Sequence, residues 1–259
     1  MVNEVPWLTV VTVVKDDLPG LEKTIRSLVG QVDLAGVEYL VVDSSKNSTT
    51  VETAVKDSLI ASALFSWCEP RGIYAAMNAG LSLARGKYIY YLNAGDSLAD
   101  PQVIADLQQI INEAEPVWVV GQVEISEASG KTVVSKSWDY HTEKKALFAR
   151  GAFPPHQGTI IRTDSLRAAG GFDAKYSISA DYAAALSLSL VSDPFMTDRV
   201  IATFFEGGVS TERWQDSFRE FHQARRMILK PRGFASLVER LNYGKHYASV
   251  WLARNLRRS

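Results

Sequence analysis

The first half of the chain alternates short, continuous apolar runs with segments whose apolar residues recur at helical spacing. The runs are rich in β-branched residues and predict strands covered on both faces, at residues 7–14, 38–43, 64–67 and 87–92. The segments with helical spacing predict helices at residues 18–29, 51–61 and 73–84. Asp100-Pro101 is typical of the cap and first turn of a further helix that runs to about Ala114. This alternation predicts an α/β domain with a mainly parallel sheet.

The second half of the chain is less regular. Two runs on either side of Ser129-Gly130 predict a hairpin, and two more predict short strands: residues 118–125, 131–137, 158–162 and 200–205. Short helices are predicted at residues 164–169 and 180–191, the second capped by Ser179. From Trp214 onward the apolar residues fall on helical stripes. The pattern therefore predicts one compact domain, residues 1–212, with an amphipathic helical C-terminal extension, residues 213–259.

Composition narrows the classes of protein that fit. The 259 residues carry 28 Lys+Arg and 29 Asp+Glu, and this formal net charge of −1 argues against a nucleic-acid partner. The single Cys68 cannot form an internal disulfide, and no Cys/His cluster has zinc-site spacing. Asn3 and Glu4 stand where a signal peptide would be basic and then apolar, and the apolar runs are only strand-length. A cytoplasmic protein is expected.

The charges are unevenly distributed along the chain. Residues 213–259 contain 11 basic and 3 acidic residues, a net of +8, so residues 1–212 carry a net of −9. A basic helical segment is typical either of a solvated helix face or of a patch for anionic partners. Both interpretations stay open at this point.

Polar side chains follow three of the predicted strands, at the point where each strand ends. They are Thr12 and Lys15, then Asp43 and Ser44, and then Asn93 and Asp96. In an open parallel sheet, ligands bind outside the carboxyl ends of the strands. Three successive strands that deliver polar groups to one edge therefore indicate a binding site there.

Common nucleotide-binding and nucleophile motifs are missing from the sequence. The turn after the first predicted strand, Lys15-Asp16-Asp17-Leu18-Pro19, lacks the glycines of a dinucleotide-binding turn. The segment from Gly80 to Lys87 has one spacer residue too many for a phosphate-binding loop, and Tyr88 stands where Ser or Thr is required. No Gly-x-Ser-x-Gly sequence occurs, so serine or cysteine nucleophilic catalysis has no support.

Several longer motifs are more specific. They are Arg71-Gly72-Ile73-Tyr74 with Met77-Asn78, Leu92-Asn93-Ala94-Gly95-Asp96, His156-Gln157, Gly170-Gly171-Phe172-Asp173 and Ala180-Asp181-Tyr182. With these motifs the sequence, from about Leu8 to about Ser210, resembles family-2 glycosyltransferases of the GT-A fold, the kind found in bacterial surface-polysaccharide assembly. The resemblance implies a Rossmann-like nucleotide-binding fold with a mainly parallel mixed sheet. It also implies a donor-binding half at residues 1–110 and an acceptor half at residues 111–212.

The resemblance implies a nucleotide-sugar donor, most often a UDP-sugar, bound across the first half of the chain. The positions that match the family's donor site are Thr12, Val13, Asp43, Ser44, Arg71, Gly72, Tyr74, Asn78, Asn93, Ala94 and Gly95. A carboxylate such as Asp43 can accept hydrogen bonds from a base N–H or a ribose hydroxyl. Gly72 would allow close approach of the backbone, and Arg71 could offset the diphosphate charge. Met77 is expected in the core.

The family's metal motif, Asp-x-Asp, is only partly present. Asn93 stands in place of the first Asp and Gly95 in place of the second, so Asp96 is the remaining carboxylate. In the family a divalent cation, Mn²⁺ or Mg²⁺, neutralises the leaving nucleoside diphosphate. Asp96 is therefore the expected metal ligand, and the departure from the motif leaves weak metal binding open.

Asp181 matches the family's catalytic base, which takes a proton from the acceptor hydroxyl during inversion at the anomeric carbon. Its expected place in the first turn of a helix favours the ionised carboxylate, because the helix dipole is positive at that end. Asp173 is the second candidate, although a turn residue is the simpler interpretation. His156 and Gln157 match a segment on the acceptor side, and residues 207–210 are expected to form a loop over the donor.

The sequence as a whole predicts an inverting glycosyltransferase that acts on a glycan or a polyprenyl-linked saccharide acceptor in polysaccharide biosynthesis. The alternative is a sugar-nucleotide-binding module with weak or no catalysis, which the degraded metal motif suggests. The basic extension is expected either to dock on anionic lipid at the inner face of the cytoplasmic membrane or to pack in a homodimer. Trp214, Phe218 and Phe221 fit a core position equally well.

Overall fold

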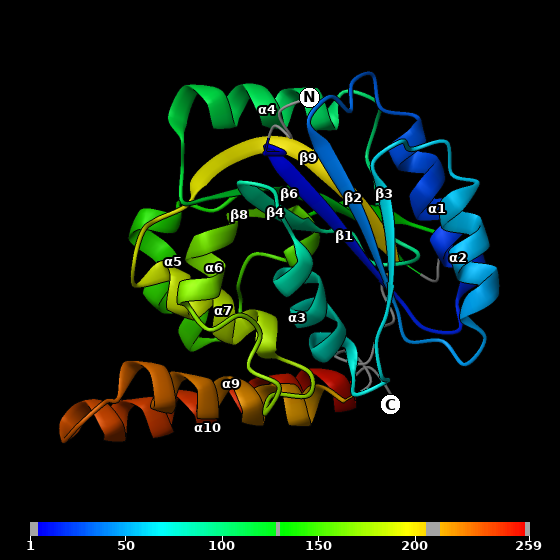
Figure 1. Ribbon diagram of the computed structural model, residues 1–259. Helices are drawn as coiled ribbons and strands as arrows, with labels where there is room; N and C mark the ends of the chain where they lie inside the picture. The colour runs from blue at the N-terminus through cyan, green and yellow to red at the C-terminus, as the bar shows by residue number, and fades with distance from the viewer. Residues whose placement is uncertain (1–4, 128–129, 206–212, 257–259) are drawn as a thin grey trace.

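The centre of the molecule is one mixed β-sheet (Figure 1). A computed structural model describes residues 5–127, 130–205 and 213–256. Within these residues the strand order is β3-β2-β1-β4-β8-β6-β9-β5, and β7 pairs with β6. The strands are β1 (Leu8–Val14), β2 (Val37–Asp43), β3 (Ala63–Trp67), β4 (Tyr88–Tyr91), β5 (Ser97–Leu98), β6 (Trp118–Ser126), β7 (Thr132–Val134), β8 (Thr159–Arg162) and β9 (Phe195–Phe205).

Parallel pairing dominates the sheet. Strand β1 pairs in parallel with β2 and with β4, β2 pairs in parallel with β3, and β6 pairs in parallel with β9. The shorter pairings β4/β8, β6/β8, β6/β7 and β5/β9 are antiparallel. All seven residues of β1 and of β2 are buried, which explains why these strands show no alternation of polar residues. The predicted α/β class with a mainly parallel mixed sheet is confirmed.

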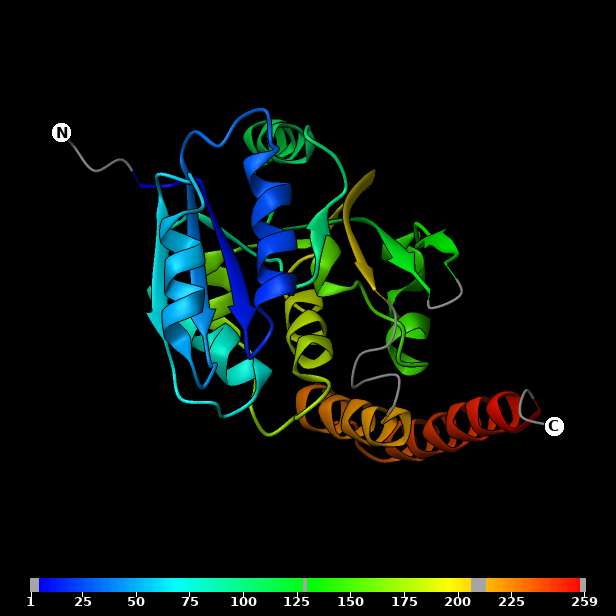
Figure 2. The ribbon, with the colours of Figure 1, turned by 90° about the vertical axis from the view of Figure 1, so that its right-hand side faces the viewer.

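Helices cover both faces of the sheet (Figures 1 and 2). Apolar side chains of α1, α2 and α4 form one core cluster with one face of the sheet, and those of α3, α6 and α7 belong to a second cluster. Met77 is fully buried in the second cluster, as expected. The helices are α1 (Leu18–Val29), α2 (Ser48–Lys56), α3 (Ile73–Leu83), α4 (Val103–Ala114), α5 (Tyr140–Ala149), the short 3-10 helix η1 (His156–Gly158), α6 (Thr163–Ala168), α7 (Ala180–Ser189), α9 (Trp214–Leu229) and α10 (Phe234–Leu256).

Several elements differ from the prediction, among them α2, which spans Ser48–Lys56 rather than residues 51–61. Helix α4 begins at Val103 rather than at Asp100-Pro101, because the Asp100 side chain accepts a hydrogen bond from the Gln102 N–H and pairs with Arg199 at 2.6 Å. Helix α5 was not predicted, since its sequence lacks a clear apolar stripe. Strand β9 begins at Phe195, five residues before the predicted start, because charged residues interrupt its apolar pattern.

The C-terminal extension forms two helices that lie side by side beneath α7 (Figures 1 and 2). Phe221 and Ile228 of α9 pack against the second core cluster, and the Trp214 ring lies 5.3 Å from the Tyr247 ring of α10. The predicted aromatic stripe of α9 is therefore an internal packing surface. In the part of the chain that the structure describes, no helix is long and apolar enough to span a membrane.

Candidate active site

The carboxyl ends of β1, β2 and β4 meet at one edge of the sheet. Strand β1 lies between the other two, with Val14 opposite Asp43 and Val11 opposite Tyr91. The Ala94 N–H donates to the Val13 carbonyl, so the turn after β4 is attached to the end of β1. The predicted gathering of polar groups at this edge is confirmed.

Asp181 lies in the first turn of α7, as predicted. Its Oδ1 accepts a hydrogen bond from the Tyr74 hydroxyl at 2.9 Å and another from the Tyr182 N–H at 2.8 Å. Its Oδ2 lies 3.6 Å from Nδ1 of His156. The side chains of His156 and Asp181 are 22% and 17% exposed, so both can be reached from solvent. The structure thus brings a partly accessible carboxylate together with two predicted site residues.

Asn93 contacts the ring of His156. The Asn93 amide Nδ2 lies 3.0 Å from His156 Nε2, and an amide NH₂ group can only donate. When the ring is neutral, Nε2 is the acceptor of this contact and the proton lies on Nδ1, the nitrogen that faces Asp181. Asn93 Oδ1 is buried and has no hydrogen-bond partner among the described residues. Asn93, which follows β4, thus contacts His156 of η1, and His156 in turn lies beside Asp181 of α7.

Asp96 is a buried carboxylate in the turn after β4. Burial raises the pKa of Asp96 to about 6, although His156, a hydrogen bond from the Gln157 side chain and Lys23 act in the opposite direction. The main chain of Gln157 is also held, because its carbonyl accepts a hydrogen bond from the Tyr90 hydroxyl at 2.8 Å. In η1, His156 thus lies beside the predicted base Asp181. Its neighbour Gln157 contacts the predicted metal ligand Asp96.

Asp43 offers an unused acceptor at the end of β2. Its Oδ1 accepts a hydrogen bond from the Ser45 N–H at 2.8 Å, whereas its buried Oδ2 has no partner among the described residues. A buried acceptor without a donor is costly, so this oxygen fits a ligand that brings an N–H or O–H group. Ser44 lies beside it with its Oγ 3.2 Å from Cys68 Sγ.

Other predicted donor residues are already engaged within the fold. The Thr12 hydroxyl donates to the Leu92 carbonyl at 2.7 Å and accepts from the Tyr39 hydroxyl. Asn78 bridges to the backbone of Phe172: its amide donates to the carbonyl at 2.6 Å, and its oxygen accepts from the N–H at 2.9 Å. These side chains hold neighbouring segments in place, and their expected contacts with a donor stay predictions.

The segment before α3 lies at the surface. Arg71 is exposed and pairs with Glu69 at 2.5 Å. Gly72 has a φ of +104° and forms the N-cap of α3, a conformation that favours glycine. Two residues later, Tyr74 turns inward to Asp181, and burial together with that carboxylate raises the pKa of its hydroxyl far above the usual value. Tyr74 therefore remains a hydrogen-bond donor to Asp181.

Lys23 of α1 was missed by the sequence analysis. Its ammonium group donates to the Gly95 carbonyl at 2.7 Å, and its charge favours the ionised form of Asp96. Nothing in the local sequence distinguishes this lysine from the other surface lysines of a helix. Gly95 itself has a φ of +93°, and its N–H donates to the Thr24 hydroxyl at 3.2 Å.

The described residues contain no group of three or more His, Cys, Asp and Glu side chains that could hold a metal ion. Asp173, the second candidate base, accepts a hydrogen bond from the Lys175 N–H and pairs with the Lys175 side chain, so it acts as a turn residue. The loop expected over the donor, residues 207–210, lies outside the described residues.

Relatives described as glycosyltransferases match most of the chain. A Mycobacterium tuberculosis protein described as an uncharacterized glycosyltransferase is 25% identical over 233 residues, covering 80% of this chain and 78% of the relative. A Mycobacterium bovis protein described as a PGL/p-HBAD biosynthesis glycosyltransferase is 26% identical over 181 residues, 67% of each chain.

Solved structures share the fold. S. aureus TarS 1-349 in complex with UDP-GlcNAc has a TM-score of 0.66 at 15% identity, and the match covers 85% of this chain and 66% of that one. The mannosyltransferase PcManGT from Pyrobaculum calidifontis, in complex with GDP-Man and Mn²⁺, has a TM-score of 0.61 at 17% identity, covering 96% and 75%. The chain spans only 39% of the longer TarS chain. These likenesses establish a fold of the GT-A glycosyltransferase type.

The sequence profile of glycosyl transferase family 2 matches residues 9–168, which is more than half of the chain. This match, with relatives named as glycosyltransferases, establishes the enzyme class. The protein belongs to glycosyl transferase family 2.

Proposed function

We propose that this protein transfers a sugar, with inversion at the anomeric carbon, from a UDP-sugar to a saccharide acceptor in polysaccharide biosynthesis. The observation that carries the proposal is the Asp181 carboxylate, which is partly exposed and lies between Tyr74 and His156. Through Asn93 it is connected to the sheet edge where donor-binding residues are expected. The relative named for a biosynthesis step supports the biosynthetic role.

Asp181 serves as the general base in the proposed reaction. The acceptor hydroxyl oxygen attacks the anomeric carbon, its proton passes to Asp181, and the bond from that carbon to the diphosphate oxygen breaks. Oδ1 already faces the Tyr74 hydroxyl and the Tyr182 N–H, so Oδ2 is the oxygen that takes the proton. His156 lies beside this oxygen, with its Nδ1 3.6 Å away, which is too far for a direct hydrogen bond.

The nucleoside of the donor is proposed to lie at the ends of β1 and β2. The buried Oδ2 of Asp43, which has no partner among the described residues, would accept a hydrogen bond from a base N–H or a ribose hydroxyl. The TarS complexes with UDP and UDP-GlcNAc support uridine as the base. Gly72 and Arg71 would lie beside the diphosphate, on its solvent-facing side.

Asp96 and the orphaned oxygen of Asn93 are proposed to face a divalent cation together with the donor's diphosphate. Both are oxygen donors, which suit a hard cation such as Mn²⁺ or Mg²⁺, and the raised pKa of Asp96 reflects a buried charge without full compensation. When bound, the cation neutralises the charge that develops on the leaving nucleoside diphosphate. The Mn²⁺ complex of PcManGT supports a metal at this kind of site.

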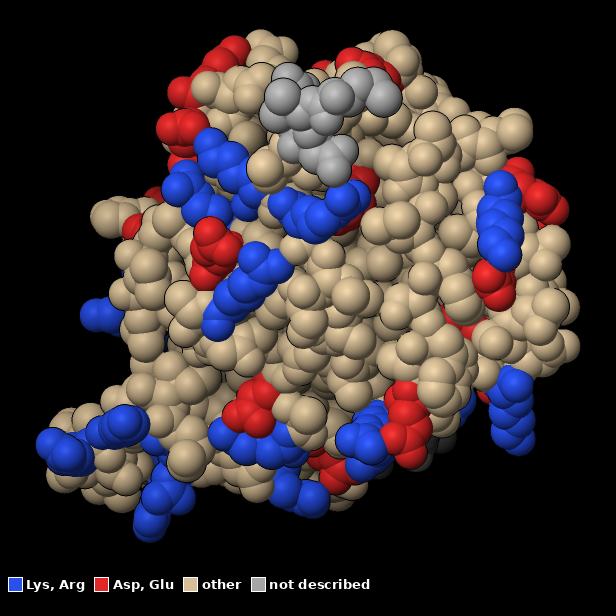
Figure 3. Space-filling view, in the orientation of Figure 1, with Lys and Arg blue, Asp and Glu red and all other residues tan. Residues whose placement is uncertain are grey.

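The acceptor is proposed to be a polyprenyl-linked saccharide, which the enzyme meets at an anionic membrane surface. Helix α10 carries exposed apolar side chains at helical spacing, Phe234, Leu237 and Leu241. Exposed lysine and arginine side chains surround the point where α9 gives way to α10, at the lower left of Figure 3. An apolar stripe with basic flanks is typical of helices that lie in a lipid interface. The alternative is that the same helices contact a second copy of the chain in a homodimer.

A second candidate function is a sugar-nucleotide-binding module without turnover. The specific observation that favours it is the incomplete metal motif, in which Asp96 is the single carboxylate after β4. The ordered contacts of Asp181 argue against it, since a pure binding module has no need of a positioned base.

Asp181→Asn separates the two functions. Turnover is expected to fall by about 100-fold or more, because an amide cannot take the acceptor proton, while the affinity for UDP stays within about twofold. The measurements are UDP release from UDP-GlcNAc, UDP-glucose and UDP-galactose with a polyprenyl-linked acceptor, and calorimetric titration with UDP, GDP, dTDP and CDP, each with and without Mn²⁺.

Asp173→Asn is the matched control, because Asp173 is a carboxylate of the same half of the chain that holds only its own turn. It is expected to retain wild-type turnover. A wild type that binds UDP without turnover would favour the binding module, and Asp181→Asn with unchanged turnover would place the base elsewhere. If the wild type binds none of the four nucleotides, the donor site is wrong.

A further inference from the structure

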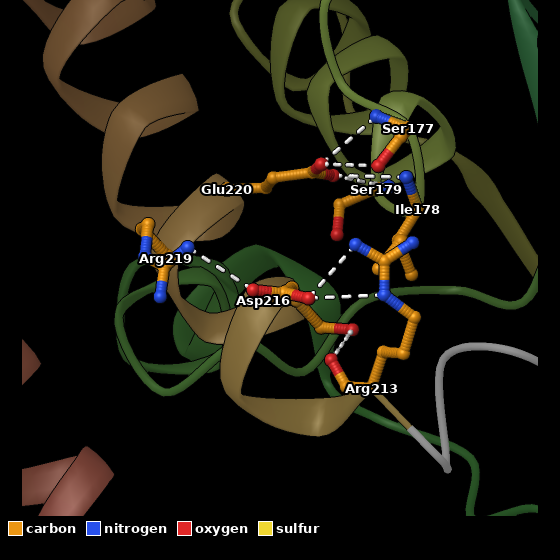
Figure 4. Close-up of polar contacts among 8 residues, drawn as sticks. Ser177, Ile178, Ser179, Arg213, Asp216, Arg219 and Glu220 are labelled. Carbon is orange, nitrogen blue, oxygen red and sulfur yellow. Dashed lines mark hydrogen bonds and ion pairs between the residues drawn. The ribbon is translucent and has the colours of Figure 1, made fainter.

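The turn that precedes α7 is held by a carboxylate from the C-terminal extension. Glu220 of α9 points at residues 177–179, as Figure 4 shows. Its Oε1 accepts hydrogen bonds from the Ser177 N–H at 2.8 Å and the Ser177 hydroxyl at 2.9 Å. Its Oε2 accepts from the N–H groups of Ile178 and Ser179, both at 2.9 Å. One side chain thus satisfies four donors at the start of the helix that carries Asp181.

Glu220 performs the task that the sequence assigned to Ser179. Ser179 occupies the N-cap position of α7, as predicted, but its side chain makes no capping hydrogen bond, and its Oγ is buried without a partner among the described residues. Helix starts leave backbone N–H groups that need acceptors, and a negative charge is favourable there. The carboxylate of Glu220 meets both needs from a different helix, 41 residues further along the chain.

The same turn is connected to the Asp181 carboxylate. The single proton of the Tyr74 hydroxyl is shared between two acceptors, the Ile178 carbonyl at 2.7 Å and Asp181 Oδ1 at 2.9 Å. The peptide groups on both sides of Ile178 are therefore fixed, one by Glu220 and the other by Tyr74. A shift of this turn would move the Tyr74 hydroxyl and with it the position of the carboxylate.

We propose that Glu220 is a positioning residue for the base Asp181, which makes α9 a part of the catalytic unit. The inference rests on the function proposed above for Asp181. Glu220 acts through hydrogen bonding rather than through packing, because both of its oxygens accept two donors each. A glutamine of the same shape would place an NH₂ group against at least one backbone N–H and lose that hydrogen bond, because among the four donors only the Ser177 hydroxyl can turn to accept.

Glu220→Gln is the discriminating variant. Its kcat is expected to fall by about 100-fold, the loss typical of a reacting group displaced by about 1 Å, while the affinity for UDP measured by calorimetry stays unchanged. Glu220→Ala is expected to give a similar kcat, because the isosteric amide does not rescue the hydrogen bonds. If packing alone mattered, Glu220→Gln would retain wild-type kcat, and that result would overturn the proposal.

Asp216→Asn is the matched control. Asp216 lies one turn earlier on α9 and pairs only with Arg213 and Arg219 in the described structure, so it has no bond to α7 (Figure 4). Its kcat and its UDP affinity are expected to equal those of the wild type. An equal loss of kcat in Asp216→Asn and Glu220→Gln would point to a general disturbance of α9 and would contradict the specific role of Glu220.

Amide hydrogen exchange tests the same inference without turnover. In Glu220→Gln the amides of residues 177–179 are expected to exchange at least about tenfold faster, with unchanged exchange in β1 and β2. Unchanged exchange at residues 177–179 would overturn the capping role. If the wild type shows no turnover, the proposed function fails, while this measurement still decides whether Glu220 holds the turn.

Discussion

At the scale of single residues, Asp96 is a buried carboxylate whose neighbours only partly offset the cost of burying its charge. Its side chain is a carboxylate in the turn after β4, and burial raises its pKa to about 6. Between about pH 4 and pH 6 the folded protein holds a proton that the unfolded chain has already released. The free energy of unfolding therefore decreases as the pH rises through this window, and the full cost of the buried charge is present above pH 6.

Asp96→Asn is expected to remove that cost. Above pH 7 its free energy of unfolding should exceed that of the wild type by about 1–2 kcal/mol, because the buried charge is gone. The same change is expected to abolish the strengthening of UDP binding by Mn²⁺, which in the wild type should weaken below pH 6 as Asp96 becomes protonated. Urea unfolding at pH 5 and pH 8 and calorimetry with and without Mn²⁺ are the measurements.

Asp57→Asn, at an exposed carboxylate after α2, provides the control for Asp96→Asn and should change neither quantity. Mn²⁺-strengthened UDP binding that persists in Asp96→Asn would contradict the assignment of Asp96 as the metal ligand.

At the scale of the element, helix α3 depends on the conformation of Gly72. The φ of +104° at this N-cap directs the chain so that the Tyr74 side chain points into the core and its hydroxyl reaches Asp181. A methyl group added to Gly72 would meet no atom within 4 Å, so the cost of alanine there comes from the backbone alone.

Gly72→Ala is expected to lower the free energy of unfolding by about 1–3 kcal/mol, the usual cost of such a backbone conformation for a residue with a side chain. A reduced kcat should accompany it, since Tyr74 follows two residues later. Gly244→Ala on α10 is the control, because Gly244 also meets no atom within 4 Å but has no positive φ. It should be neutral or slightly stabilising. Equal stability of Gly72→Ala and wild type in urea would refute the argument.

At the scale of the whole molecule, the basic extension divides into an inner and an outer part. Arg225 of α9 is buried and donates to the Phe148 carbonyl and to Glu239, so this cation belongs to the core. Further along the extension lie exposed basic residues that form no ion pair with a described residue: Arg226, Lys230, Arg232, Arg240 and Lys245. Removing residues 213–259 would therefore disturb the core and the Glu220 contacts, together with any docking surface.

The exposed apolar side chains of α10 can be tested without removing the extension. The triple change Phe234→Ser, Leu237→Ser and Leu241→Ser is expected to weaken binding to vesicles of phosphatidylglycerol and phosphatidylcholine by about tenfold or more, because it removes exposed apolar surface. Wild-type binding should also weaken with added salt. Leu59→Ser, at a fully surface-exposed leucine of the first half, is the control. Vesicle binding that the triple change leaves intact would exclude α10 as the docking surface, and a dimer that dissociates instead would support the homodimer.

Much of this architecture could be predicted from the sequence, because the signals are local. Continuous apolar runs identified β1, β2 and β4, and the polar residues that end them had to meet once the strands were parallel. Asp181 and Asp96 were identified as candidates by their motifs and by their places at a helix start and a strand end. The boundary at residue 212 remains a prediction of the sequence pattern, and the packing of α9 on α7 supplies the contacts that cross it.

Only the tertiary structure decided which of these residues act on one another. His156 contacts Asn93 across 63 residues, Tyr74 contacts Asp181 across 107, and Glu220 reaches Ser179 across 41. Hydrophobic spacing determines which face of an element is buried, but pairs this distant depend on how the helices pack against the sheet. The sequence by itself therefore determined most of the strands and helices and the sheet edge where polar residues gather, and it supplied the candidate residues. The packing of α3, α7 and α9 decided how the Asp181 carboxylate is held.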